Sequence, residues 1–225
     1  MRLTSSHRKW WLAFLLVYGA FVFLPFTAPV LMNWKLDGLG KAVYFFYSFF
    51  CHQLPERSLF LFGEKWMYSF SEISAVWQNT DNPMILRQFI GTTDMGWKVA
   101  WSDRMISMYG GVWLAGLIWG LVQKRLNKVS IWVLILSTLP IILDGGMHIL
   151  SDLNGLTSGF RFTNDWLAIL TNHAFAPSFY LGDALGSFNS WMRWVTGLLF
   201  GFGLVWWAFP YIDESFRYQK RLNLD

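Results

Sequence analysis

The sequence has very little cysteine, with Cys51 as the single thiol among 225 residues. One thiol excludes a disulfide within the chain and any metal site that needs several thiolates. The sequence also contains no glycine-rich phosphate-binding loop, no dinucleotide-binding fingerprint, no nucleophile elbow and no His-Glu-x-x-His motif. The function classes that depend on these motifs therefore receive no support.

Charged residues are also scarce, at 14%, whereas hydrophobic residues make up 54% of the chain. This balance argues against a soluble globular protein. The 15 tryptophans and 21 phenylalanines instead suit a membrane protein with aromatic belts at its interfaces. The net charge of +4 is not gathered into a basic run, so we expect the lipid bilayer, and no nucleic acid, as a partner.

Four apolar stretches are long enough to cross a bilayer, which predicts an all-α polytopic membrane protein. The chain is expected to form a single membrane domain over residues 1–225, with spans at about residues 10–32, 105–122, 129–150 and 191–210. Two long loops, 33–104 and 151–190, connect the spans on one side of the membrane. In the first loop, Val43–Phe50 is too short to span and is expected to lie in the interface or to re-enter the membrane.

The other side of the membrane is predicted to carry three basic segments, residues 1–9, 123–128 and 211–225. Their nine basic and three acidic residues are Arg2, Arg8, Lys9, Lys124, Arg125, Lys128, Arg217, Lys220 and Arg221, with Asp213, Glu214 and Asp225. The positive-inside rule makes this side cytoplasmic. We therefore expect a bacterial plasma-membrane protein with both termini in the cytoplasm and both long loops outside.

The third span carries ionisable groups near its end. Asp144, His148 and Asp152 are four residues apart, so they share one face of a helix. Asp144 lies roughly 22 Å along a helix that starts at Val129, near the far boundary of a hydrocarbon core about 30 Å thick. An ionisable residue at such a depth indicates a functional site, with Asp144 and His148 as candidate catalytic residues. Alternatively, Asp144 only bonds a neighbouring helix.

The predicted topology gathers the polar groups in one layer at the outer face. This argues against a channel or carrier, which needs ionisable groups at several depths. The candidate ligand-binding residues are Cys51, His52, Arg57, Arg104 and Arg193. Arginine forks fit phosphate oxygens, so these arginines are candidates to hold an anionic lipid headgroup. The alternative is that the three arginines pair with nearby acidic residues, namely Glu56, Asp103 and Asp144.

A divalent metal such as zinc is the one cofactor that the sequence suggests. Its candidate ligands are His52, Asp144, His148 and Asp152, with an open position for water. The alternative is a buried network in which the same groups pair with arginines. Cys51 is either a nucleophile activated by a nearby histidine or a small buried packing residue.

Residues 51–58, Cys-His-Gln-Leu-Pro-Glu-Arg-Ser, resemble the Cys-His-Gln-x-x-x-Arg-Ser signature of a family of small bacterial membrane proteins called domain of unknown function 2085. Further motifs of that family resemble Arg104, Asp144-Gly145, and Arg193 followed by Thr196-Gly197. The resemblance covers roughly residues 44–201. Many relatives have a cysteine beside the position of Ser102, which this chain lacks, so the resemblance implies no two-thiol role here. It implies no activity.

Three functions remain open on the sequence. The first is a polar pocket at the outer face that binds an ion or an anionic lipid headgroup. The second is a membrane-embedded hydrolase or transferase that acts on a lipid-linked substrate. The third is a subunit of a larger membrane complex, which meets its membrane-protein partner through the close-packing pairs Gly116/Gly120 and Gly197/Gly201 and through the aromatic loops 65–101 and 156–190. The alternative for the glycines is that some of them serve contacts inside the bundle. For this third function, every charge should find a partner within the chain and no cavity should remain.

Overall fold

The computed structural model describes residues 5–123 and 127–222. Within them, four helical segments are long and apolar enough to cross a membrane. These are α1 (Ser5–Phe23) with its continuation through η1 (Leu24–Phe26) and α2 (Thr27–Asn33), then α6 (Asp103–Val122), α7 (Ile131–Asp152) and α11 (Phe188–Leu222). The predicted all-α polytopic fold is confirmed. Four residues used for the orientation lie outside the described residues, namely Arg2, Lys124, Arg125 and Asp225.

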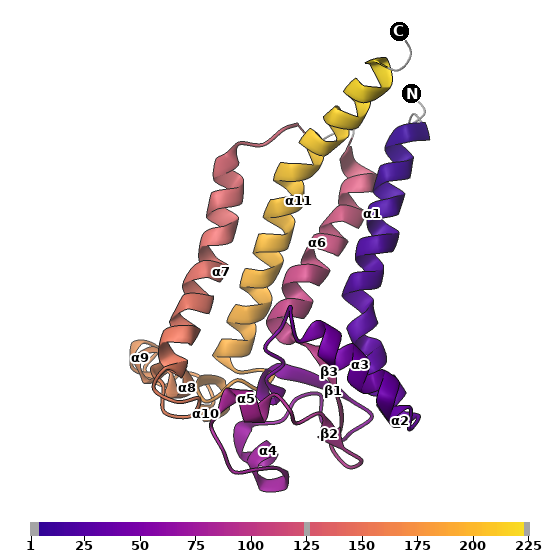
Figure 1. The fold of residues 1–225 in the computed structure, drawn as a ribbon. Helices are drawn as coiled ribbons and strands as arrows, with labels where there is room; N and C mark the ends of the chain where they lie inside the picture. The colour runs from indigo at the N-terminus through magenta and orange to yellow at the C-terminus, as the bar shows by residue number, and fades with distance from the viewer. Residues whose placement is uncertain (1–4, 124–126, 223–225) are drawn as a thin grey trace.

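The four long helices form an elongated bundle in which α11 packs against both α6 and α7, and α1 packs mainly against α6 (Figure 1). Gly197 and Gly201 allow α11 to approach α6 closely, since a Cβ on Gly201 would lie 2.6 Å from the backbone nitrogen of Val112. The start of α1 and the end of α11 lie at one end of the bundle. The two long loops lie together at the other end.

The glycine pairs that were expected to meet a partner protein are covered within the chain. Gly116 and Gly120 face aromatic side chains of α1 and α11, while Gly197 and Gly201 face α6. The close-packing surfaces at these glycines are therefore buried by other helices of the same chain. A membrane-protein partner therefore stays a prediction, without a free glycine face at these four positions to support it.

The helix α7 begins where a side chain can cap it. Ser130 accepts a hydrogen bond from the backbone N–H of Trp132, so the first helical residue is Ile131. Asp144 and His148 are both 4% exposed and lie on the buried face, as their spacing predicts. Asp152 is the last residue of the helix. This face therefore directs ionisable groups toward the loop end of the bundle.

The first loop contains a small antiparallel sheet that the sequence did not predict. The elements of the first loop are α3 (Asp37–Tyr47), η2 (Pro55–Arg57), β1 (Ser58–Leu61), α4 (Phe70–Val76), α5 (Pro83–Leu86), β2 (Gly91–Thr92) and β3 (Gly96–Ser102). Strand β3 is central, between β1 and β2. Ser58 of β1 pairs with Ser102, and β3 runs directly into α6. This pairing fixes the segment that precedes β1 beside the start of α6.

The segment that was expected in the interface forms the end of α3 and the turn after it. Phe45, Phe46, Phe49 and Phe50 are exposed, while Tyr47 on the opposite face is buried. This distribution suits a helix that lies along the membrane surface. Its placement in the interface stays a prediction.

The second loop contains three short helices, α8 (Phe160–Thr163), α9 (Asp165–Leu170) and α10 (Pro177–Tyr180). Asn164 joins the first two in a left-handed conformation with φ of 47°. Its buried amide donates to the backbone oxygens of Arg161 and Tyr180 at 2.7 and 2.8 Å. Asparagine tolerates this backbone conformation better than most residues. The loop is therefore drawn together around Arg161.

Candidate functional site

Arg57, at the end of η2, ties the first loop to α7 and to the second loop. Its Nη1 and Nη2 atoms donate to the two carboxylate oxygens of Asp152 at 2.9 and 3.0 Å. Its Nε donates to Asp183 at 2.9 Å. All three guanidinium nitrogens therefore have carboxylate partners, in the forked geometry that makes such pairs strong.

Arg193, near the start of α11, holds two further carboxylate contacts. Its Nε lies 2.7 and 2.9 Å from the oxygens of Asp103, and its Nη1 lies 2.6 Å from Asp183. Asp183 therefore bridges Arg57 and Arg193. Burial opposes the charge on Asp183, but these two guanidiniums outweigh it and hold the pKa of Asp183 well below its ordinary value.

Asp144 of α7 is enclosed by two arginines. Arg104 of α6 donates to its Oδ2 and Arg161 of α8 donates to its Oδ1, each at 2.7 Å. The Nε2 atom of His148 lies 3.2 Å from the same Nη2 atom of Arg161. A guanidinium can only donate, so Nε2 accepts and the neutral ring carries its proton on Nδ1. Nδ1 is buried and has no hydrogen-bond partner among the described residues.

The expected metal site of His52, Asp144, His148 and Asp152 is not assembled. Across residues 5–123 and 127–222, no three His, Cys, Asp or Glu side chains are grouped as a metal ion would require. Arginines occupy the carboxylates of Asp144 and Asp152 instead. The arrangement corresponds to the alternative of a buried ion-pair network, and a zinc cofactor gains no support from it.

The candidate catalytic residues are brought together, with His148 Nε2 lying 3.9 Å from Asp144 Oδ1. However, the lone pair on Nε2 already accepts from Arg161, and Nδ1 carries the proton. A general base needs a free lone pair directed at its substrate. Catalysis by His148 and Asp144 therefore stays a prediction that this geometry does not favour.

Cys51 is a buried thiol in the segment before η2, in contact with Ser102 at the end of β3. Its Sγ accepts from the backbone N–H groups of Gln53 and Ser102, both at 3.3 Å. Burial raises the pKa of Cys51 despite these hydrogen bonds, so the thiolate form is disfavoured. This environment fits the packing alternative better than the nucleophile.

His52 is a neutral side chain close to several arginines. Its Nδ1 accepts from the backbone N–H of Leu54 at 3.1 Å. His52 is exposed at the surface, but desolvation by the surrounding protein and the charges of Arg57, Arg104 and Arg193 lower the pKa of its ring. His52 therefore adds no positive charge near neutral pH.

Glu56 differs from every other acid in this layer. It is 3% exposed, and no other residue within the described part of the chain donates a hydrogen bond to either carboxylate oxygen; its own backbone N–H is the one donor close enough to lower its pKa. The sequence suggested Glu56 as a partner of the arginines, but Arg57 turns to Asp152 and Asp183 instead. Burial raises the pKa of Glu56 to about 7, and the charge of Arg57 only partly offsets this effect.

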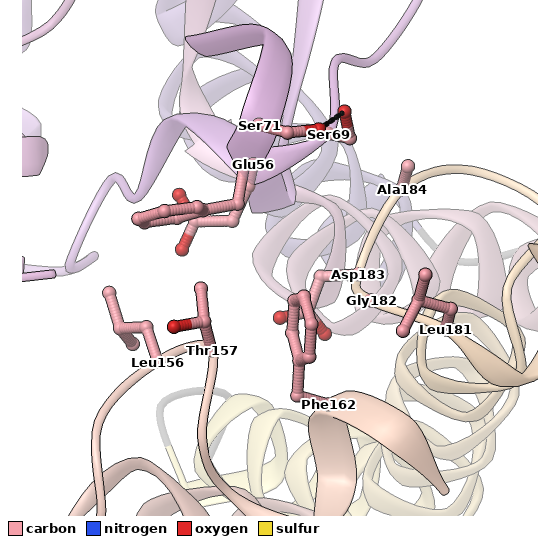
Figure 2. Close-up of a pocket in the computed structure, with 11 residues that line it drawn as sticks. Glu56, Ser69, Ser71, Leu156, Thr157, Phe162, Leu181, Gly182, Asp183 and Ala184 are labelled. Atoms are coloured by element: carbon pink, nitrogen blue, oxygen red, sulfur yellow. Dashed lines mark hydrogen bonds between the residues drawn. The ribbon is translucent and has the colours of Figure 1, made fainter. Parts of the chain in front are cut away.

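Glu56 lines a pocket of about 310 Å³ between the two long loops (Figure 2). The first loop contributes Glu56 and residues 69–71, and the second contributes residues 156–157, Phe162 and 181–184. In Figure 2 one carboxyl oxygen of Glu56 points into the space between the loops, toward Leu156 and Thr157. Asp183 lines the same pocket, so the ion-pair network reaches one of its walls.

Local hydrogen bonds fix the pocket walls. Ser69 and Glu72 form a capping box that starts α4 and so positions the first-loop wall. In the second loop, Gly182 has φ of +73°, and its N–H donates to the backbone oxygen of Phe162 at 2.7 Å. Glycine adopts this conformation without the steric penalty of a side chain. The pocket is therefore built by ordered turns.

Besides Asp103 at the start of α6, three further residues of this region were not among the predicted site residues, namely Glu56, Arg161 and Asp183. All three lie in the long loops, where residue spacing does not define a shared face as it does on a helix. Their one signal is charge in a chain where charged residues are scarce.

The family described as "Predicted membrane protein (DUF2085)" matches residues 93–207, just over half of the chain. The chain belongs to this family. The matched region runs from β3 into α11, so it contains both Asp144 and Asp183. It begins after Cys51–Ser58, so the signature that suggested the family is not tested by this match. The bacterial origin also stays a prediction.

A second comparison gives a relative with a similarly general description. The chain is 23% identical over 217 residues to "Uncharacterized protein MJ1492" of Methanocaldococcus jannaschii, covering 92% of this chain and 95% of that protein. No solved structure matches the chain. The comparisons therefore establish a membrane-protein family, and any activity must be argued from the site.

Proposed function

We propose that this membrane protein binds a small ligand in the pocket between its two long loops, with Glu56 as the main polar contact. The proposal rests on one observation, a buried carboxyl group on the pocket wall to which no other described residue donates a hydrogen bond. Buried polar groups are nearly always paired, and an unpaired one costs about 1–3 kcal/mol. A ligand in the pocket would supply the missing partner.

The contacts of the arginines argue against an anionic lipid headgroup as the ligand. Four buried or half-buried arginines each donate to at least one aspartate, in a layer made of Arg57, Arg104, Arg161 and Arg193 with Asp103, Asp144, Asp152 and Asp183. A phosphate would have to compete with these carboxylates. Replacing one partner of a buried ion pair is unfavourable unless the new partner fits equally well.

The presence of the pocket also favours ligand binding over a purely structural role. A subunit that uses its charges only to tie loops to the bundle should pair each of them and leave no cavity. The four arginines meet this condition, but Glu56 and the pocket beside it do not. This contrast is why we favour ligand binding over assembly.

We further propose that the pocket opens on the outer side of the plasma membrane, with both termini in the cytoplasm. The support is the basic composition of the segments at the opposite end of the bundle, where α1 starts and α11 ends. Positively charged loops favour the cytoplasmic side. The ligand would then reach the pocket from outside the cell.

A covalent occupant tests whether the pocket accepts a ligand. Thr157→Cys introduces a thiol on the pocket wall, and Ser158→Cys introduces a matched thiol on the exposed surface beside it. Each purified variant is modified with methyl or benzyl methanethiosulfonate, while buried Cys51 in the unmutated protein serves as the background control. The benzyl adduct at position 157 should raise the unfolding temperature by about 3 °C over the methyl adduct, because the ring buries apolar surface.

The two adducts at position 158 should give equal unfolding temperatures, since neither enters the pocket. A Thr157→Cys thiol that does not react in the folded protein would contradict the proposal. So would a benzyl adduct at position 157 that lowers the unfolding temperature, because the space would then be too small for a ligand.

A further inference from the structure

The charge on Glu56 has no cationic partner in the described part of the chain. Arg57 is its neighbour, but its three guanidinium nitrogens donate to Asp152 and Asp183. The Nζ atom of Lys98 is buried nearby and donates to two backbone oxygens, those of Gln53 and Arg87. The positive charges around Glu56 are therefore directed elsewhere.

The pocket walls are acidic. Among the 11 described residues that line it, Glu56 and Asp183 are acidic and none is basic. The oxygens of Asp183 already accept from Arg57 and Arg193, so Glu56 offers the free acceptor atoms. An anion in this space would face two carboxyl groups without a fixed positive donor, whereas a cation would be attracted by both.

The size and the apolar walls indicate an organic ligand. A Ca²⁺ ion takes six to eight oxygen ligands, whereas the pocket offers two carboxyl groups and its volume is about 310 Å³. Phe70, Leu156, Phe162 and Leu181 supply hydrocarbon surface around the space. Aromatic faces also attract cations at short range.

We propose that the pocket binds an organic cation, an ammonium group on a short hydrocarbon or aromatic arm, with the Glu56 carboxylate as its counter-ion. This inference rests on the proposed function and names the class of ligand for the same site. The ammonium would donate to the two free oxygens of Glu56, and the arm would pack against the phenylalanine and leucine side chains.

Binding should release a proton near neutral pH. The charged groups that face Glu56 are Arg57, Asp183 and Lys98. Burial, the largest effect, raises the pKa of Glu56 to about 7 together with the charge of Asp183, and the charges of Arg57 and Lys98 only partly offset this. A large fraction of empty pockets therefore holds a protonated acid at pH 6.5, whereas an ammonium binds the ionised form. The affinity should consequently rise between about pH 6 and pH 8, and the heat of binding should depend on the buffer.

The test compares three aromatic probes of similar size by calorimetry on the purified full-length protein, namely 2-phenylethylammonium, 2-phenylethanol and 3-phenylpropionate. The ammonium should bind about tenfold tighter than the alcohol, and the carboxylate should bind most weakly. Glu56→Gln should weaken the ammonium about tenfold and change the alcohol less than about twofold. Glu64→Gln, an exposed residue of the same loop, is the matched control and should change neither.

The outcomes separate this inference from the proposed function. Equal binding of ammonium and alcohol, unaffected by Glu56→Gln, would overturn the cation while leaving a ligand pocket. The cation would equally be overturned if no probe bound although the benzyl adduct of Thr157→Cys stabilised the protein. If neither the probes nor the adduct stabilised it, both proposals would fail.

The ammonium group could belong to a free amine or to a lipid headgroup, and the membrane composition distinguishes these sources. The 2-phenylethylammonium titration is repeated in phosphatidylglycerol nanodiscs with and without phosphatidylethanolamine. Weaker binding in the presence of phosphatidylethanolamine would support a lipid headgroup as the cation. Equal binding in both would support a free amine.

Discussion

The charged layer at the loop end of the bundle has two halves that use the same residue types differently. In the first half, Asp144 is shared by Arg104 and Arg161, so two guanidiniums surround one carboxylate. The second half contains two arginines, Arg57 and Arg193, and four acidic residues. Asp103, Asp152 and Asp183 pair with these arginines, and Glu56 does not. The surplus of acid in the second half lies against the pocket.

The comparison shows that pairing, rather than residue type, separates a structural charge from a candidate site. A buried charge without a partner is strongly unfavourable, so paired groups hold the elements that carry them. Arg104, Asp144 and Arg161 join α6, α7 and α8 in this way. Glu56 holds no element to another, because its carboxyl group contacts the pocket instead. Each prediction below either disrupts one half or measures the difference between them.

The largest effect is expected where one arginine serves two aspartates. Arg193→Met should leave Asp103 without its arginine and Asp183 with Arg57 alone, and should lower the free energy of unfolding by about 5 kcal/mol. The measurement is unfolding in mixed detergent micelles, with yield of folded protein as a second readout. Lys65→Met removes an exposed ion pair with Glu72 and should leave stability nearly unchanged. Similar losses in both variants would contradict the structural role of Arg193.

Disrupting the first half should have a somewhat smaller effect. Asp144→Asn removes the one carboxylate between Arg104 and Arg161, which then repel each other, and should lower the free energy of unfolding by about 3 kcal/mol. Sulfate should recover part of this loss by replacing the negative charge. Asp94→Asn, at an exposed position of the first loop, is the control without an expected loss. If Asp144→Asn is tolerated without added anion, the first half is not a structural tie.

The second half should show its surplus acid as a pH dependence. Burial raises the pKa of Glu56 from its ordinary value of 4.5 to about 7. Between these values the folded protein binds the proton more tightly than the unfolded chain, so stability is full below about pH 4.5 and falls as the pH rises to about 7. The loss should total about 3 kcal/mol and should disappear in Glu56→Gln.

The difference in stability between the unmutated protein and Glu56→Gln at each pH isolates the contribution of Glu56 from those of the other titrating groups. Lys98, whose pKa burial lowers to about 7, acts above that pH and in the opposite direction. Its folded form loses the proton first, so its contribution to stability is lowest below pH 7 and increases as the pH rises further. A parallel pH profile for the unmutated protein and Glu56→Gln would show that Glu56 is not a buried acid.

The long helices were predictable from sequence, because long apolar runs and regular helical spacing define them. Apolar runs of about 20 residues specify spans, and a spacing of four residues placed Asp144 and His148 on one buried face. The sheet was not predictable, because β1 has four residues and β2 has two, too few to establish an alternating pattern. The fold class followed from the spans, and the arrangement of the loops did not.

The site was predictable as a set of charged residues but not as a set of contacts. Arg57 pairs with the distant residues Asp152 and Asp183 and not with its neighbour Glu56, and this pairing leaves the carboxyl group of Glu56 free. Asp183 lies 126 residues away from Arg57 in the chain, so only tertiary structure brings them together. Sequence spacing could not reveal this pairing, nor could it show that Glu56 faces a pocket.

The smallest expected effect comes from two adjacent glycines of α7 beside the first half. A Cβ on Gly145 would lie 2.6 Å from Nη1 of Arg104, whereas a Cβ on Gly146 would meet no atom of the described residues within 4 Å. Alanine is favoured over glycine inside a helix by about 0.5–1 kcal/mol, so Gly146→Ala should stabilise the protein by that amount.

Gly145→Ala should lose this gain, because Arg104 must move and its contact with Asp144 must lengthen. Unfolding of both variants in the same detergent should therefore differ by about 1 kcal/mol. The Gly145→Ala effect should largely vanish in the Asp144→Asn background, where Arg104 has no charged partner to leave. Equal stabilisation by both alanines in the unmutated background would mean that Arg104 shifts freely, and that the first half is held less tightly than its ion-pair geometry indicates.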